Sequence, residues 1–246
     1  MLKVAGLSKI YKDGTCALDN VSFSLKEGEF VTILGKSGAG KSTLLRCINR
    51  LVEPTEGKIS LDGEEITGAS RSRLRALRRK IGMIFQQYNL VKQASVRTNV
   101  LTGRLGYQPS WGGFVNRFPE QEIESAMEKL KDLGIGEKFH QRADRLSGGQ
   151  QQRVGIARTL MQEPKLILAD EPVSSLDPET SRTIMEILQH INRKQKVTLL
   201  CNLHLPELAR EFGNRVLVLK EGRIFYDGSL ADLDAEKIKD AYGSAS

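Results

Sequence analysis

Hydrophobic and polar positions in the first fifty residues predict two strands, a loop and a helix. Residues Val21–Leu25 alternate between apolar and polar side chains, which is typical of a strand with one buried face. The run Phe30–Leu34 is short, apolar and rich in β-branched residues, which indicates a central strand. Apolar residues then recur at helical spacing over 41–51, and a glycine-rich stretch at 35–42 separates that helix from the second strand.

The rest of the chain alternates between strand and helix patterns. Short apolar runs predict further strands at 59–61, 81–85, 166–169, 197–203, 215–219 and 223–226. Helices are predicted at 71–80, 91–101, 120–133, 147–161 and 178–193. The segment 103–119 is rich in Gly, Pro and aromatic residues, and we expect it to be a loop. This order predicts an α/β core that carries an α-helical insertion.

The amino-acid composition indicates what class of protein this is but says little about its function. The 246 residues suit one large domain or a core with one inserted subdomain, and the apolar fraction of 39% is that of a globular protein. No apolar stretch approaches the roughly 20 residues that span a bilayer, and no secretion signal opens the chain. The three cysteines, Cys16, Cys47 and Cys201, are too widely spaced to indicate a disulfide framework or a zinc site.

The net charge of +7 is concentrated in part in one helix. Six basic residues and no acid lie between Arg71 and Lys80, with Arg71, Arg75 and Arg79 at i, i+4 spacing. Such a face could contact anionic lipid, contact an acidic protein loop, or simply be exposed to solvent. We expect no nucleic-acid partner, because the run has no interleaved aromatic residues and no RNA-binding motif follows it.

The stretch from Gly35 to Ser42 carries the strongest chemical signal, because it matches the pattern G-x-x-x-x-G-K-[ST] at every position. Its glycines let successive backbone N–H groups face phosphate oxygens, and the following helix adds its positive end. Lys41 can reach the β- and γ-phosphates of a nucleoside triphosphate, and the Ser42 hydroxyl can ligate Mg²⁺. The predicted nucleotide site comprises Gly35, Lys36, Ser37, Gly38, Ala39, Gly40, Lys41, Ser42 and Thr43.

Two acids follow the predicted strand at 166–169. A carboxylate at the end of a buried strand, here Asp170, can hold Mg²⁺ through its water shell. The adjacent Glu171 can orient or deprotonate the attacking water, which is the kind of positioning that phosphoryl transfer requires. Asp170 is therefore a candidate metal residue and Glu171 a candidate catalytic base.

A second anion-binding helix start is predicted at Leu146-Ser147-Gly148-Gly149-Gln150. Ser147 is a favourable helix cap, and the glycines leave backbone N–H groups open to an anion.

These three motifs, in this order, resemble the ATP-binding subunit of an ABC (ATP-binding cassette) transporter. The stretch from Leu146 to Gln150 matches the signature sequence of that family residue for residue. The resemblance implies a single ABC ATPase domain over 1–246. Its α/β P-loop NTPase (RecA-like) core, with an antiparallel β subdomain, would be formed by 1–87 and 163–246, and 88–162 would be an inserted α-helical subdomain.

The resemblance also implies roles for residues outside the three motifs. Tyr11 would stack on adenine, and Gln86 would contact Mg²⁺ and the attacking water, although the neighbouring Gln87 leaves that position ambiguous by one residue. Asp177 would communicate across the dimer, and His204 would sense the γ-phosphate.

In this family two chains enclose two ATP molecules, so the resemblance implies a homodimer in which Ser147, Gly148, Gly149 and Gln150 of one copy face the phosphate loop of the other. It implies ATP and Mg²⁺ as ligands, membrane permease subunits as partners, and a periplasmic or lipid-anchored substrate-binding protein as an indirect partner. The expected location is the cytoplasmic face of the bacterial inner membrane, peripheral through the permease.

Several segments resemble the phosphonate-importer subfamily, which indicates uptake of phosphonate or a related phosphorus oxyanion. These segments are Asn89–Val91, Val100–Tyr107 with its Gly-Arg-Leu-Gly-Tyr stretch, Trp111, Phe118 and Cys201–His204. Two alternatives remain open at this point, namely import of another small solute such as an amino acid, and a non-transport ATPase switch.

Overall fold

The computed structural model describes residues 1–107, 118–229 and 232. Trp111, which contributes to the subfamily resemblance, and most of the segment predicted as a loop lie outside the described residues.

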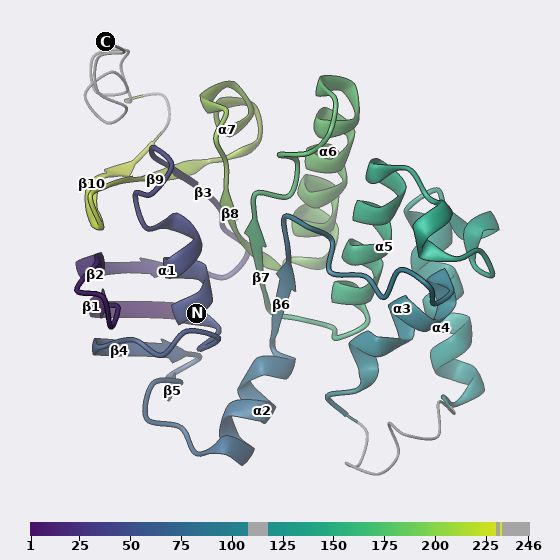
Figure 1. Ribbon diagram of the computed structural model, residues 1–246, viewed down its shortest axis with the longest axis horizontal. Helices are drawn as coiled ribbons and strands as arrows, with labels where there is room; N and C mark the ends of the chain where they lie inside the picture. Colours follow the sequence, from purple (N-terminus) through teal and green to yellow (C-terminus); the bar gives the residue numbers. More distant parts are fainter. Residues whose placement is uncertain (108–117, 230–231, 233–246) are drawn as a thin grey trace.

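A six-stranded sheet forms the centre of the molecule, and five of its strands are parallel (Figure 1). The strand order is β10-β9-β3-β8-β7-β6, and β10 pairs with β9 in antiparallel orientation. The strands are β3 (Phe30–Leu34), β6 (Ile81–Ile84), β7 (Leu166–Asp170), β8 (Thr198–Asn202), β9 (Arg215–Lys220) and β10 (Arg223–Gly228). Because β3, β7 and β8 are parallel neighbours, their carboxyl ends and the loops that follow them meet at one edge of the sheet.

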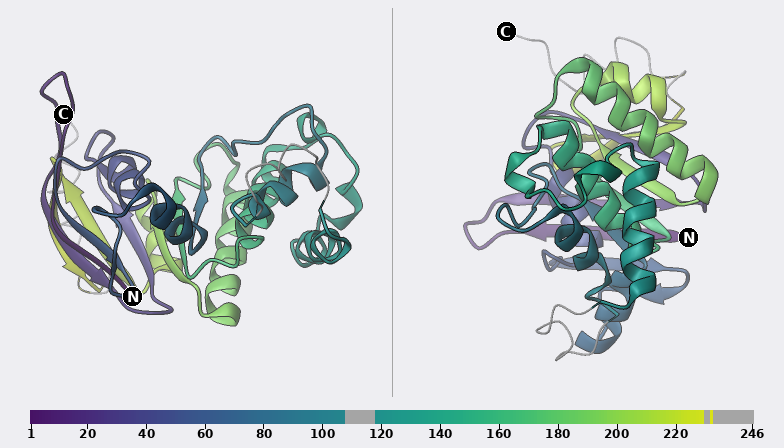
Figure 2. Two further views of the ribbon diagram at one scale, coloured as in Figure 1. Left: turned by 90° about the horizontal axis from the view of Figure 1, so that it is seen from below. Right: turned by 90° about the vertical axis from the view of Figure 1, so that its right-hand side faces the viewer.

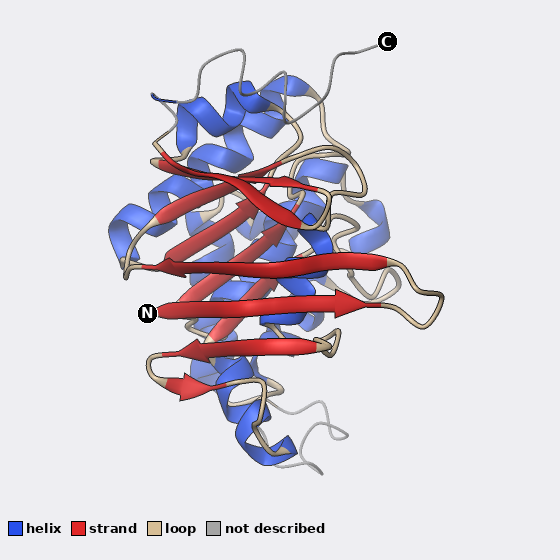
Figure 3. Cartoon of the chain, turned by 90° about the vertical axis from the view of Figure 1, so that its left-hand side faces the viewer, coloured by secondary structure: helices blue, strands red, loops and turns tan. Residues whose placement is uncertain are grey.

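A second, antiparallel sheet of four strands lies beside the first (Figure 3). Its order is β2-β1-β4-β5, from β1 (Leu2–Ile10), β2 (Cys16–Leu25), β4 (Glu56–Leu61) and β5 (Glu64–Glu65). Buried and exposed residues alternate along β2, as its sequence predicts. Helix α1 (Lys41–Ile48) packs between the two sheets, with Leu44 and Ile48 in the same apolar cluster as Leu7 and Ile33.

The other helices are α2 (Arg71–Arg79), α3 (Val96–Leu101), α4 (Glu120–Asp132), α5 (Gly148–Leu160), α6 (Pro178–Gln195) and α7 (Pro206–Phe212), with 3-10 turns at Thr102–Arg104, Gly136–Lys138 and Ala143–Arg145. Of these, α2 lies beside β4 and β5, whereas α3, α4, α5 and α6 lie on the side of the parallel sheet away from the antiparallel one (Figure 1 and Figure 2). Alternate residues of β7 face opposite clusters, so that Ile167 packs with α5 and α6 while Leu168 packs with α1. The predicted α/β fold is confirmed, with an antiparallel β subdomain and helices inserted between β6 and β7.

Two predicted helix boundaries were wrong, and strands β1 and β5 and one helix were not predicted. The helix expected at 91–101 begins only at Val96, because Ser95 caps it and the Asn99 side chain binds both backbone groups of Val91. The helix expected at 41–51 ends at Ile48, since Arg50 has a left-handed backbone with φ of 52°. The short helix α7 was not predicted, although Pro206 at its first position is a common helix start.

Within 1–107 and 118–229, no helix combines the length and the apolar character that crossing a membrane requires.

Candidate functional site

The glycine-rich loop joins β3 to α1 and curls around the side chain of Lys41. Gly40 has φ of 101°, and a Cβ atom there would lie 2.3 Å from the carbonyl oxygen of Ala17, so only glycine fits. The Lys41 ammonium donates hydrogen bonds to the carbonyl oxygens of Gly35 (2.7 Å) and Lys36 (3.0 Å). The loop is thus closed on a lysine that is only 4% exposed.

Lys41 is a buried cation at the start of a helix. Burial lowers the pKa of its ammonium, and the charges of Glu171 and Asp170 act in the opposite direction. Helix α1 has no acid in its first turn, so its N-terminal N–H groups and their positive dipole end are not neutralised locally. A phosphate group fits this combination of cation and helix start.

Asp170 ends β7 and is held by three donors from two neighbouring elements. Its Oδ1 atom accepts hydrogen bonds from Ser42 Oγ (2.7 Å) and Asn202 Nδ2 (2.9 Å). Its Oδ2 atom lies 3.5 Å from Nη2 of Arg46 on α1. The structure therefore brings together Ser42 and Asp170, the two candidate magnesium residues, although they are 128 positions apart in sequence.

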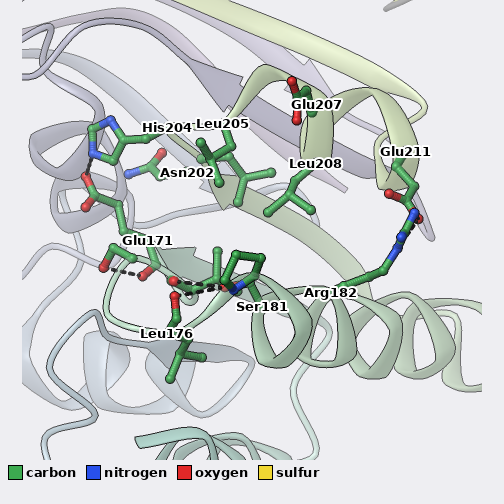
Figure 4. Close-up of a pocket in the computed structure, with 14 residues that line it drawn as sticks. Glu171, Leu176, Ser181, Arg182, Asn202, His204, Leu205, Glu207, Leu208 and Glu211 are labelled. Carbon is green, nitrogen blue, oxygen red and sulfur yellow. Dashed lines mark hydrogen bonds and ion pairs between the residues drawn. The ribbon is translucent and has the colours of Figure 1, made fainter.

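Glu171 and His204 form a contact across the carboxyl ends of β7 and β8 (Figure 4). The Nε2 atom of His204 is hydrogen bonded to Oε1 of Glu171. Glu171 has a left-handed backbone with φ of 51°, a conformation that costs energy in a residue with a side chain. This turn lets Asp170 face α1 while Glu171 faces His204 at the edge of a pocket of about 490 Å³.

The signature residues form the first turn of α5. Ser147 and Gln150 make a reciprocal capping box, in which Ser147 Oγ accepts from the backbone of Gln150 and Gln150 Oε1 accepts from the backbone of Ser147. Next to the cap, a Cβ atom on Gly148 would lie 2.9 Å from Tyr88 Oη and 3.2 Å from Leu176 Cδ2. Gly148 is therefore enclosed by side chains from the segments that follow β6 and β7.

The remaining candidate residues occupy the ends of separate elements. Tyr11 follows β1, and its hydroxyl lies 3.3 Å from Oγ1 of Thr43, beside the start of α1. Asp177 caps α6 by accepting from the backbone of Thr180 at 2.9 Å. Gln86 is exposed just after β6.

One chain does not assemble all of these residues at one place. The phosphate loop, Asp170, Glu171 and His204 meet at one edge of the parallel sheet. The turn that begins α5 lies on the other side of that sheet from α1 (Figure 1).

Sequence reasoning missed three contacts of the site. Asn202 contributed only to the subfamily resemblance, although a polar amide within the apolar run 197–203 was a usable signal. Arg46 and Tyr88 gave no signal, because one is a helix residue among many basic ones and the other lies in an irregular segment.

The strand, glycine-rich loop and helix around Lys41 define a P-loop nucleoside triphosphatase. A protein-family model described as ABC transporter matches residues 18–174, and relatives of this family match almost the whole chain. The chain belongs to the ABC transporter family, as an ATP-hydrolysing subunit.

The relatives and solved structures agree on this assignment. The phosphonates import ATP-binding protein PhnC 3 of Halalkalibacterium halodurans is 49% identical over 99% of this chain and 94% of that protein. PhnC of Lactobacillus johnsonii is 50% identical over 98% of this chain and 95% of that protein. A cassette solved as a dimer after hydrolysis, bound to ADP and Pi, is 37% identical with a TM-score of 0.83 over 94% of this chain and 99% of that chain. An ABC transporter cassette in its ADP conformation is 27% identical, with a TM-score of 0.85 over 97% of both chains.

Proposed function

We propose that this chain hydrolyses ATP to drive the uptake of phosphonate or a related phosphorus oxyanion. The observation that carries the proposal is near full-length similarity, at 49% and 50% identity, to proteins named for phosphonate import in two bacterial genera.

The segment Gly103–Tyr107, which contributes to the subfamily resemblance, is held in place by contacts of Arg104 and Tyr107. The Arg104 guanidinium lies 4.3 Å from the ring centroid of Tyr107, and the Tyr107 hydroxyl donates to the carbonyl oxygen of Gln162 at 2.7 Å. The segment is thereby anchored to the end of α5.

The roles follow from the chemistry of each group. Lys41 and the backbone N–H groups of 35–42 bind the phosphates, and Tyr11 stacks on the adenine. Glu171 accepts a proton from the attacking water, while His204 holds the Glu171 carboxylate and contacts the γ-phosphate. Gln86 reaches this water and the metal from its exposed position after β6.

The side chains around Asp170 fit Mg²⁺ as the metal that accompanies ATP. Ser42 and Asp170 offer a hydroxyl and a carboxylate oxygen, which are the hard donors that Mg²⁺ prefers, and we infer that the Gln86 amide oxygen approaches the metal as a third. In the described parts of the chain, no group of three or more His, Cys, Asp and Glu side chains could hold a metal. Mg²⁺ is usually bound by a few protein groups together with substrate phosphates. Bound Mg²⁺ would neutralise charge on the phosphates.

The working unit is a dimer of this chain with membrane permease subunits. ABC cassettes are found as dimers among the solved relatives. Because the turn at Ser147–Gln150 lies away from the phosphate loop of its own chain, the phosphate loop that it completes belongs to the second copy, and Asp177 lies at the same junction. The dimer is held by permease subunits at the cytoplasmic face of the inner membrane, and a periplasmic or lipid-anchored protein delivers the substrate.

We assign the catalytic core and β subdomain to 1–87 and 163–246, and the helical subdomain to 88–162. Strands β3 and β6–β9 support the first assignment, and helices α3–α5 support the second.

Growth on phosphonate as sole phosphorus source tests this function. In a strain with no other phosphonate uptake system, the wild-type gene should permit growth and Lys41→Ala, expressed at the wild-type level, should not. Normal growth with Lys41→Ala would refute the uptake role. If the Lys41→Ala strain grows normally on phosphonate but fails to grow on an amino acid, the chain serves import of another solute. If this strain grows as well as the wild type on every solute, the chain is a non-transport switch.

A further inference from the structure

Strand β8 contains a fully buried polar side chain. Its residues Leu199, Leu200 and Cys201 are apolar and buried, whereas Asn202, at the end of the same strand, is an amide with 0% exposure. An amide that leaves water without a hydrogen-bond partner destabilises the folded chain, so a buried one indicates a partner or a ligand.

The amide nitrogen of Asn202 has a hydrogen-bond partner, Asp170. Strands β7 and β8 are parallel, and Asp170 is paired with Asn202 in their register. Nδ2 of Asn202 donates to Oδ1 of Asp170 at 2.9 Å, the same oxygen that accepts from Ser42 at 2.7 Å. Donors from β8 and α1 thus converge on one carboxylate oxygen and fix the rotamer of Asp170.

The amide oxygen of Asn202 has no hydrogen-bond partner among the residues that the structure describes. A carboxylate only accepts hydrogen bonds, so the NH₂ group must face Asp170 and the carbonyl oxygen must face away. This Oδ1 atom is buried and accepts no hydrogen bond from the described residues. Asn202 also lines the pocket of about 490 Å³ together with Glu171 and His204 (Figure 4). Asn202 therefore lies at the border between the buried core and the candidate reaction site.

We propose that Asn202 is a positioning residue for the magnesium–nucleotide site. Its amide nitrogen holds the Asp170 carboxylate toward Ser42 and thereby orients this carboxylate for the metal. The inference rests on the proposed function, because it takes Ser42 and Asp170 as the magnesium residues. Partners that orient a metal-binding carboxylate in this way affect metal affinity strongly when they are removed.

The test compares Asn202→Val with Asn202→Thr, which have nearly the same shape and are both suited to a buried strand. Of these two side chains, only threonine has a hydroxyl that can donate to Asp170 in place of the amide nitrogen. The probe is Mn²⁺ with ADP, and its dissociation constant is measured by electron paramagnetic resonance. The valine variant should bind Mn²⁺ about tenfold more weakly than the wild type, and the threonine variant should lie between them. ADP affinity without a divalent ion should be unchanged in both.

Asn192→Leu is the matched control. Asn192 is also a buried asparagine of the core, but its amide donates to the backbone carbonyl oxygens of Gly28 and Val197. It should leave Mn²⁺ affinity at the wild-type value. Equal Mn²⁺ affinity of the Val and Thr variants, or an equal loss in Asn192→Leu, would overturn the proposal.

Asp170→Asn separates this failure from failure of the proposed function. If the wild type binds Mn²⁺ with ADP and Asp170→Asn does not, the metal site stands and the Asn202 variants decide the inference alone. If Asp170→Asn binds Mn²⁺ as tightly as the wild type, the magnesium assignment itself is wrong.

Discussion

The guanidinium of Arg158 donates a 2.9 Å hydrogen bond to the carbonyl oxygen of Tyr88. A second bond, of 2.5 Å, reaches the carbonyl oxygen of Asn89. Tyr88 and Asn89 both have left-handed backbones, with φ of 57° and 48°, and they follow Gln86 by two and three residues. One arginine on α5 therefore holds an unfavourable backbone turn beside a predicted catalytic residue.

Replacing Arg158 with alanine should destabilise the fold and disturb this turn. Two carbonyl oxygens would lose charged donors, so we expect the free energy of unfolding to fall by about 1–3 kcal/mol. ATP turnover should fall as well, because Gln86 would lose its support, while ADP affinity stays unchanged. Urea denaturation and steady-state ATPase assays measure both. Arg193→Ala is the control, since Arg193 is an exposed residue of α6 and its removal should change stability by less than about 0.5 kcal/mol. Equal stability of the Arg158 and Arg193 variants would contradict this expectation.

Gly148→Ala should impair ATP turnover through a steric clash. The new methyl group would lie 2.9 Å from Tyr88 Oη and 3.2 Å from Leu176 Cδ2, so either these side chains or the turn at the start of α5 must move. Single-chain ADP binding at the distant phosphate loop should be unaffected. Adding Tyr88→Phe removes the hydroxyl and should restore part of the turnover, as measured in the double variant. No recovery in the double variant would show that the contact with Tyr88 is not the cause.

The buried Lys41 should make stability depend on pH. Burial lowers its folded-state pKa below the ordinary value of 10.5, so the unfolded chain binds more protons between the two pKa values. The stability that the wild type has relative to Lys41→Met should therefore increase as the pH rises through that window. Denaturant unfolding of both proteins at about pH 7 and about pH 10 measures the change. A difference that stays constant, or that falls at the higher pH, would contradict the assigned burial.

Only one of the three thiols should react in the folded protein. Cys47 and Cys201 are buried, and burial raises the pKa of Cys47 to about 11 and raises that of Cys201 as well, so neither forms a thiolate readily. Cys16 is exposed at the start of β2. A thiol-specific reagent should modify Cys16 under native conditions and all three cysteines in denaturant, which mass spectrometry of peptides can locate. Native modification of Cys201 would mean that β8 is less well packed than described.

The sequence predicts what depends on local pattern. The run Phe30–Leu34 and the glycine-rich loop predict β3 and the start of α1, and the apolar run 166–169 predicts that Asp170 ends a strand. Resemblance then supplies candidate roles for residues such as Gln86 and His204, which their local patterns alone do not define.

What the sequence does not predict depends on pairing between distant segments. The bond from Asn202 to Asp170 requires β8 to lie beside β7, and the enclosure of Gly148 by Tyr88 and Leu176 requires three segments to converge. The start of α3 was missed because the Asn99 side chain replaces helical hydrogen bonds at Val91.

Uptake of labelled methylphosphonate tests whether ATP hydrolysis by this chain drives phosphonate import. The cells should lack their own copy of this gene and receive either the wild type or Glu171→Gln, with both proteins present at equal abundance. We expect uptake with the wild type and background uptake with Glu171→Gln, because the proposed catalytic base is absent. Uptake by the Glu171→Gln cells at the wild-type rate, or none in the wild-type cells with permease present, would contradict this expectation.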